Sequence, residues 1–151
     1  MPNTGFVQVD AFADEPFRGN PAAVVVLDGP ADEAWMQSGA CEMNLSETAF
    51  CHPSDTHGGS GAAEWNLRWF TPVSEVDLCG HATLATAHVL VSEHEITGEI
   101  GFHTRSGRLA AVAGDYGIRL DFPVDVIKAR DVTQRMSDAV GTEVEAAGRG
   151  A

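Results

Sequence analysis

Short stretches of alternating apolar and polar residues predict several β-strands along this chain. Residues 4–13 (TGFVQVDAFA) alternate in this way, and residues 64–72 (EWNLRWFTP) place two tryptophans and a leucine on one face. Residues 22–27 (AAVVVL) and 46–52 (SETAFCH) are brief apolar runs, which are typical of buried strands. All of these ranges are therefore expected to be strands.

Two longer stretches have the spacing or the composition of helices. Trp35, Gly39 and Met43 recur every four positions within residues 31–43, which places them on one face of a helix. Residues 81–92 (HATLATAHVLVS) are apolar nearly all round, and a helix without a polar face is normally buried on several sides. Its small alanines would let the neighbouring elements approach closely.

Three further strand-like runs follow at residues 98–107, 108–117 and 118–123, separated by glycine-containing turns at hairpin spacing. The resulting order, β–β–α–β–β–α–β–β–β, predicts an α+β domain with one helix wrapped by strands. The pattern ends at Pro123, after which residues 132–140 form one candidate amphipathic helix.

The net charge of the chain limits which binding partners are expected. Asp and Glu number 22 against nine Lys and Arg, which gives a net charge of −13, and Lys128 is the single lysine. Such a surface repels phosphate backbones, so no nucleic acid partner is expected. An acidic surface with almost no lysine is also typical of proteins that work in concentrated salt, where self-repulsion is screened. We therefore interpret the chain as halophilic.

The cysteines and the amino terminus favour a cytoplasmic protein. Cys41, Cys51 and Cys79 are odd in number and lack CxxC spacing, so neither a disulfide framework nor a structural zinc site is expected. The first 16 residues carry acids and lack the basic and apolar regions of a signal peptide. No apolar run approaches the ~20 residues of a membrane span, so no membrane association is expected.

Cys79, Gly80 and His81 stand where the apolar helix is expected to begin. The first N–H groups of a helix have no partner within it, and Gly80 would let an anion approach them, which predicts a niche for a carboxylate or a phosphate. In that niche Cys79 would have a lowered thiol pKa and act as a base or nucleophile, and His81 would donate a hydrogen bond or shuttle a proton. The same three residues also have a purely structural explanation: a small buried cysteine, a glycine that permits close packing and a histidine that is hydrogen-bonded to the backbone.

Glu47 and Asn20 are further candidates, each with a structural alternative. Glu47 in NLSETAF would act as general acid and base in a dry pocket, or would face water on an edge strand. Asn20 in RGNP would present its amide to a substrate, or would cap a turn. The other histidines show no i, i+4 pair and no HExxH motif, so no metal site is expected. These histidines are His52, His57, His88, His94 and His103.

Three stretches, taken in order and at their mutual spacing, resemble one known family. VDAFADEPFRGNPAAVVVL, EMNLSETAF and LRWFTPVSEVDLCGHATLATAHVL are similar to the amino-terminal half of the PhzF-like phenazine-biosynthesis isomerases. The resemblance runs from about Phe6 to Phe122. It implies the fold of diaminopimelate epimerase and proline racemase, with a mostly antiparallel sheet wrapped around a central buried helix.

The resemblance also implies a proton transfer, without a cofactor, on a small carboxylated substrate. Glu47 matches the glutamate that takes a proton from one carbon and returns it to another, and Gly80–His81 matches the pair that holds the substrate. Asn20 stays a candidate for substrate binding. Cys79 matches a catalytic cysteine of the epimerase relatives, which keeps a cysteine-dependent epimerase or racemase as an alternative.

The chain departs from the family in its length. Members have two similar domains with the active site between them, and the second domain completes the substrate cage. We expect residues 1–122 to be the first domain, and 123–151 to be a linker and the truncated start of a missing second one. The domain would then form a homodimer, pair with a separately encoded second half, or be an inactive fragment or a small-carboxylate-binding domain.

The halophilic interpretation predicts that molar KCl preserves or raises the melting temperature, Tm. Added ions screen the repulsion among the 22 acidic side chains, and this repulsion opposes the compact state. Thermal unfolding followed by circular dichroism from low salt to molar KCl measures the effect. A fall in Tm across this series would remove the interpretation.

Overall fold

The computed structural model describes residues 4–55, 61–124 and 126–150. Within these ranges the chain forms strands and helices in the following order: β1 (Val7–Ala11), β2 (Asn20–Val26), α1 (Glu33–Met43), β3 (Glu47–Pro53), β4 (Ala63–Phe70), β5 (Glu75–Val76), α2 (Gly80–Glu93), β6 (Glu99–Thr104), β7 (Gly107–Gly114), β8 (Gly117–Asp121), β9 (Lys128–Arg130), α3 (Gln134–Val140) and β10 (Ala147–Arg149).

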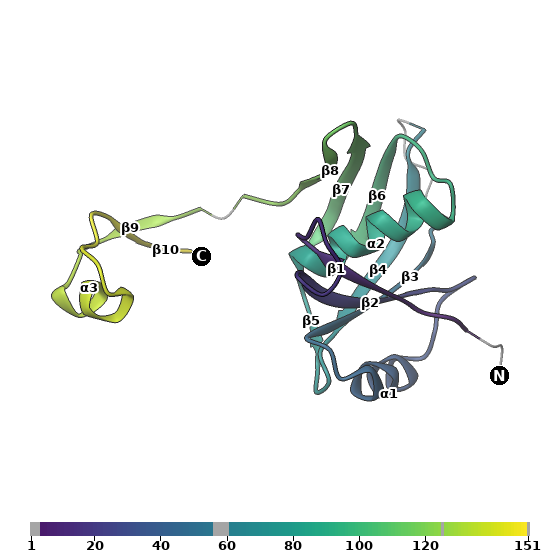
Figure 1. Cartoon of the computed structure of the whole chain (residues 1–151), viewed down its shortest axis with the longest axis horizontal. Coiled ribbons are helices and arrows are strands. Elements are labelled where there is room, and N and C mark those ends of the chain that lie inside the picture. Colours follow the sequence, from purple (N-terminus) through teal and green to yellow (C-terminus); the bar gives the residue numbers. More distant parts are fainter. Residues whose placement is uncertain (1–3, 56–60, 125, 151) are drawn as a thin grey trace.

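Strands β1 to β8 form one curved, mixed sheet (Figure 1). Its order is β1-β2-β3-β4-β6-β7-β8, and the short β5 pairs with β4. The pairs β2–β3 and β4–β6 are parallel, whereas the other pairs of this sheet are antiparallel. A parallel pair needs a crossover connection, which α1 supplies between β2 and β3 and α2 between β4 and β6. The predicted α+β class and mostly antiparallel sheet are confirmed.

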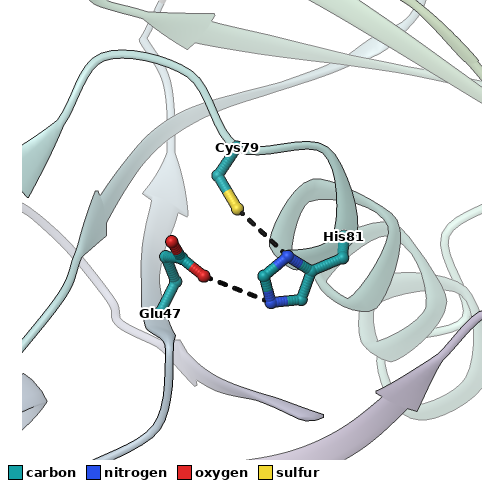
Figure 2. A group of neighbouring side chains, drawn as sticks. All are labelled: Glu47, Cys79 and His81. Atoms are coloured by element: carbon teal, nitrogen blue, oxygen red, sulfur yellow. Dashed lines mark hydrogen bonds and ion pairs between the residues drawn. The ribbon is translucent and has the colours of Figure 1, made fainter. Parts of the chain in front are cut away.

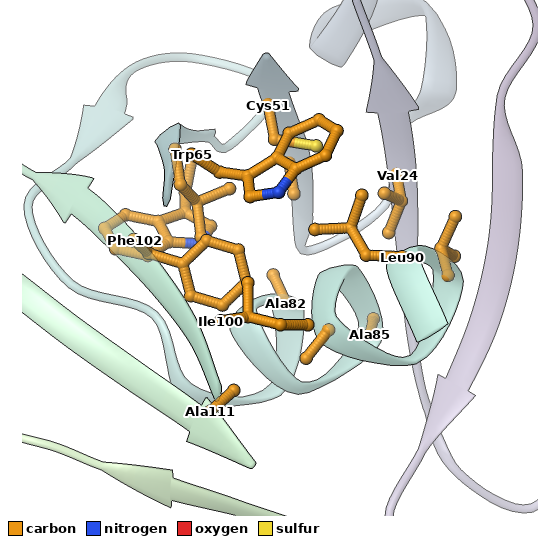
Figure 3. Close-up of a cluster of buried hydrophobic side chains, with 14 of the residues drawn as sticks. Val24, Cys51, Trp65, Ala82, Ala85, Leu90, Ile100, Phe102 and Ala111 are labelled. Atoms are coloured by element: carbon orange, nitrogen blue, oxygen red, sulfur yellow. The ribbon is translucent and has the colours of Figure 1, made fainter. Parts of the chain in front are cut away.

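Helix α2 lies in the hollow of this curved sheet (Figures 1 and 3). It contacts β1, β2, β3, β7 and β8, and its residues Ala82, Ala85 and Ala87 are fully buried. Large side chains of the strands, among them Trp65 and Phe102, pack around the helix (Figure 3). The small alanines permit this close approach, so the helix predicted to be buried on several sides is found in the core.

Helix α1 covers part of the opposite face of the sheet. Phe50 of β3 and Phe70 of β4 pack edge to face there, with ring centroids 5.7 Å apart, and Met36 of α1 packs in the same cluster. The helix begins after Asp32, whose carboxylate accepts a hydrogen bond from the Trp35 N–H at 3.0 Å. This packing holds the parallel pair β2–β3, and the first residues of these two strands are candidate site residues.

The predicted elements are found with shifted ends. β1 stops at Ala11, before Phe12, which has a left-handed backbone with φ of 61°. Strands β5, β9 and β10 were not predicted, because each has only two or three residues and so carries no alternating pattern. No helix within the described ranges is long and apolar enough to cross a membrane.

Beyond β8 the chain runs to a small unit that lies apart from the main sheet (Figure 1). In this unit β9 pairs antiparallel with β10, and α3 connects them. α3 starts at Gln134, two residues later than predicted, and none of its residues is buried. The predicted division between residues 122 and 123 stays a prediction.

A buried carboxylate links three strands of the sheet. The Glu64 side chain on β4 is 2% exposed and accepts a hydrogen bond from Arg108 Nη2 of β7 at 2.7 Å. His103 Nε2 of β6 lies 2.8 Å from the same carboxylate, as an ion pair without hydrogen-bond alignment. A Cβ at Gly101 of β6 would collide with the Glu64 carboxylate and the Arg108 guanidinium. The hydrogen bond from Arg108 lowers the pKa of Glu64 below its ordinary value.

We expect Glu64→Gln to lower the free energy of unfolding by about 1–3 kcal/mol at neutral pH, because Arg108 loses a charged partner. The loss stays below that of a fully buried pair, since the Arg108 side chain is 38% exposed and also contacts Glu99. The folded-state pKa of Glu64 is depressed, so its contribution is present above the ordinary carboxyl pKa and is lost as the pH falls. The difference in stability between the wild type and Glu64→Gln should therefore shrink as the pH falls. Urea unfolding of the two proteins, from neutral pH to below pH 4, measures this difference.

Glu99→Gln is the matched control, because the Glu99 side chain contacts the same Arg108 but is 41% exposed. Exposed pairs contribute about 0–1 kcal/mol, so this variant should unfold nearly like the wild type. Equal losses for the two variants would show that burial of Glu64 contributes nothing.

Candidate active site

Glu47 is the first residue of β3, and the alternation of the strand directs its side chain to the face that holds α2. Ala49 and Cys51, at the next alternate positions, belong to the core around α2, whereas Phe50 packs under α1. Ala22 of β2, the parallel partner of Glu47, is also in the α2 core. The Glu47 side chain is 20% exposed, so the carboxylate lies at the margin of the core and is reached by solvent.

The amino end of α2 meets this carboxylate (Figure 2). His81 lies between two partners: its Nε2 is 3.4 Å from Glu47 Oε2, and its Nδ1 is 3.4 Å from Cys79 Sγ. Ser46 Oγ lies 3.3 Å from the same Nε2. The contacts with Ser46 and Cys79 have hydrogen-bond geometry, whereas Glu47 lies at ion-pair distance. With its proton on Nε2, the imidazole accepts a hydrogen bond from the Cys79 thiol at Nδ1.

The first turn of α2 faces the same space. Cys79 is the N-cap residue, with extended backbone (φ −143°, ψ 120°) and no side-chain capping hydrogen bond. Gly80 is exposed, and apart from its chain neighbours and the backbone of its own helix, the described atom nearest to a Cβ built there is Phe122 Cζ at 4.0 Å. The positive end of the helix dipole therefore has an open approach, which favours an anion.

The predicted lowering of the Cys79 pKa is wrong. Burial raises the pKa of this thiol to about 11, because desolvation disfavours the thiolate, and the charge of Glu47 raises it further. The backbone N–H groups of Ala82 and His81 lower the pKa, as expected of a helix start, but by less. The thiol is therefore protonated at neutral pH.

Asn20 lies at the start of the strand next to Glu47. It stands two positions before Ala22, the partner of Glu47, so Asn20 and Glu47 lie on the same face of the sheet. The Asn20 side chain is exposed and makes no hydrogen bond within the described part of the chain, which disfavours the turn-capping alternative. Gly19 is required before it, because a Cβ there would lie 2.5 Å from the Ala11 carbonyl oxygen.

The structure thus brings three of the candidates together and adds one. A carboxylate oxygen of Glu47, Cys79 Sγ and a ring nitrogen of His81 lie within 4.8 Å of one another, with Gly80 adjacent in the chain. Ser46, which contacts His81, was missed; its position beside Glu47 in the sequence was the available signal. His57, one of the histidines without a ligand pattern, lies outside the described residues.

A cavity of about 430 Å³ lies beside α1. Arg68 and Arg105 line it, and each lies 2.6 Å from Glu75 Oε2. Arg68 also pairs with Glu33 and Arg105 with Asp77, so the two positive charges are compensated. Because Glu47, Cys79 and His81 do not line this cavity, it is not part of the candidate site.

Comparison with solved structures places the fold in the diaminopimelate-epimerase-like class. A PhzF-family phenazine biosynthesis protein of Enterococcus faecalis superimposes with a TM-score of 0.83 at 42% identity, covering 96% of this chain and 54% of that one. A predicted epimerase of Pseudomonas aeruginosa superimposes with a TM-score of 0.66 at 24% identity, covering 89% and 49%, which shows the fold alone.

The sequence comparisons define the family. The family model described as phenazine biosynthesis-like protein matches residues 9–144. An uncharacterized isomerase of Halalkalibacterium halodurans is 47% identical over 99% of this chain and 55% of its own length. This chain belongs to the PhzF-like family, and the resemblance inferred from its motifs is confirmed. It spans about half the length of the curated relatives it matches.

We expect Gly80→Ala to fold normally, with Tm unchanged or slightly raised. The space at Gly80 accommodates a methyl group, and alanine is favoured over glycine in a helix, by about 1 kcal/mol in its interior and by less at the first position, where Gly80 lies. Circular dichroism measures both the fold and Tm. A fall in Tm of several degrees would show that Gly80 is required for packing, and would remove the reason to associate it with an approaching anion.

Proposed function

We propose that this chain is the amino-terminal half of an isomerase that moves a proton on a small carboxylated substrate without a cofactor. The contact between Glu47 and His81 at the start of α2 carries the proposal. It joins an acid/base group to a site with an affinity for anions, and these are the two elements that such a reaction needs.

Glu47 is the proposed acid and base. Its carboxylate takes a proton from a carbon of the substrate, the C–H electron pair enters the conjugated system of the substrate, and the protonated Glu47 returns the proton to a second carbon. His81 Nε2 lies 3.4 Å from the carboxylate and fixes its orientation, as Ser46 helps to fix His81. No atom is gained or lost, so the product is an isomer.

The first turn of α2 is the proposed anchor for the substrate carboxylate. Its N–H groups and the helix dipole stabilise a negative charge, including the charge that spreads from the breaking C–H bond. Gly80 leaves room for this approach, and Asn20, on the same sheet face as Glu47, is the proposed donor to another polar group of the substrate.

A cysteine-dependent epimerase is the second candidate, since Cys79 Sγ lies 3.4 Å from His81 Nδ1. We favour Glu47 because its side chain is 20% exposed, whereas Cys79 is 7% exposed and lies deeper in the core. A substrate carbon therefore has a more direct approach to the carboxylate than to the sulfur.

Closure of the site is proposed to come from a second half. The relatives are about twice as long as this chain, and in the described structure Gly80 and Asn20 remain exposed. Covering them would exclude water and fix the substrate. A second copy of the chain or a separately encoded domain would supply this cover, and residues 123–151 are the proposed linker towards it.

We expect Glu47→Gln to lower the rate of proton transfer at least about 100-fold while leaving Tm and carboxylate binding nearly unchanged. Glutamine keeps the shape of the side chain but has no ionisable carboxyl group that could take up and return a proton. The measurement is deuterium incorporation from D2O into a panel of small carboxylic acids, followed by NMR. Binding is measured from shifts of the Gly80 and His81 amide signals. Glu42→Gln, an exposed acid of α1, is the control and should retain full activity.

Cys79→Ser separates the two candidates. Retained exchange in Cys79→Ser with loss in Glu47→Gln supports the glutamate isomerase, and the reverse result supports the cysteine epimerase. Carboxylate binding without exchange by the wild type identifies a binding domain. No binding at Gly80 and His81 identifies an inactive fragment.

A further inference from the structure

We propose that Glu47, Cys79 and His81 form a binding site for a zinc-type divalent metal ion. The sequence predicted no metal site, because neither its histidines nor its cysteines have the spacing of a known metal-binding motif. The fold instead assembles three different donors from two elements: an oxygen from β3, a sulfur from the N-cap of α2 and a nitrogen from its first turn (Figure 2).

The donor set matches the chemistry of zinc. Thiolate, imidazole and carboxylate are the ligands that Zn²⁺ uses in proteins, and three protein ligands with one open position are typical of its solvent-accessible sites. Hard ions such as Mg²⁺ and Ca²⁺ prefer oxygen ligands and disfavour a site with one sulfur and one nitrogen. The expected ion is therefore Zn²⁺ or a close analogue such as Co²⁺.

The sulfur–nitrogen distance is close to that of a tetrahedral site. Zn–S and Zn–N bonds of about 2.3 and 2.0 Å place sulfur and nitrogen about 3.5 Å apart. Cys79 Sγ and His81 Nδ1 are 3.4 Å apart, so this pair is nearly preformed. The three donors lie within 4.8 Å of one another, but Glu47 Oε2 contacts the other ring nitrogen, Nε2, at 3.4 Å. The carboxylate must therefore move towards the Nδ1 side of the ring to complete the site. Its 20% exposure leaves room for this movement.

The dipole of α2 opposes a cation at this helix start, whereas the charge of the whole chain attracts one. The net charge of −13 draws cations towards the protein, and the exposed Gly80 leaves a side of the cluster open to water as the fourth ligand. Binding of the ion is independent of the proposed isomerase activity. The effect of the ion on catalysis does rest on that activity. A bound ion would occupy the Glu47 carboxylate and so inhibit proton transfer.

Titration of the reduced protein with Co²⁺ tests the site, because a cobalt–thiolate bond gives a charge-transfer absorption that nitrogen and oxygen ligands do not. We expect one Co²⁺ per chain with this band, its loss in Cys79→Ser, and its retention in the control Cys41→Ser, whose cysteine is exposed. Glu47→Gln and His81→Gln should weaken binding at least about 10-fold.

Absence of the band, its persistence in Cys79→Ser, or its loss in Cys41→Ser would overturn the proposal. Should Cys79→Ser not fold, X-ray absorption of the zinc-loaded wild type decides: one sulfur at about 2.3 Å supports the site, and a shell of nitrogen and oxygen alone refutes it. Deuterium exchange with and without Zn²⁺ then tests inhibition separately, so an inactive protein that binds zinc contradicts only the proposed function.

Discussion

The burial of α2 in the curved sheet is the constraint on which the rest of the structure depends. The helix has no polar face, so strands must cover it on several sides, and its alanines set how closely they approach. Once the helix is held in this way, its amino end has a fixed position at the margin of the core. Cys79 makes no side-chain capping hydrogen bond, but its thiol contacts His81 and its carbonyl oxygen accepts a hydrogen bond from Thr83. Packing places this turn, and these local contacts hold its side chains.

The second constraint is the parallel pair β2–β3. Parallel strands start at the same edge of a sheet, so a crossover through α1 brings the first residues of both strands to one place. Asn20 and Glu47 are these first residues, and the α1 cluster of Phe50, Phe70 and Met36 holds the pair together from the other face. The site therefore combines an edge of the sheet with the start of a helix.

The sequence predicted the elements that carry strong patterns. The all-round apolar composition of residues 81–92 predicted the buried helix, and alternation predicted β4. Glu47 was identified through the resemblance of NLSETAF, because its chemistry alone did not distinguish it from a surface glutamate. The contacts of His81 with Glu47 and Ser46 join residues about 35 positions apart, and no local pattern encodes such a distance. β5, β9 and β10 were too short to be seen.

The error over Cys79 shows where sequence reasoning stops. A helix start lowers a thiol pKa, and the N–H groups of His81 and Ala82 act in that direction. The larger effect is desolvation, and it depends on how many strands cover the sulfur, which only the tertiary structure reveals. In the proposed metal site, the neutral thiol would become a ligand only when the entering cation displaces its proton. A substrate carboxylate and a metal ion would therefore use this site in different ways. In both cases the burial of α2 determines which side chains the ligand contacts.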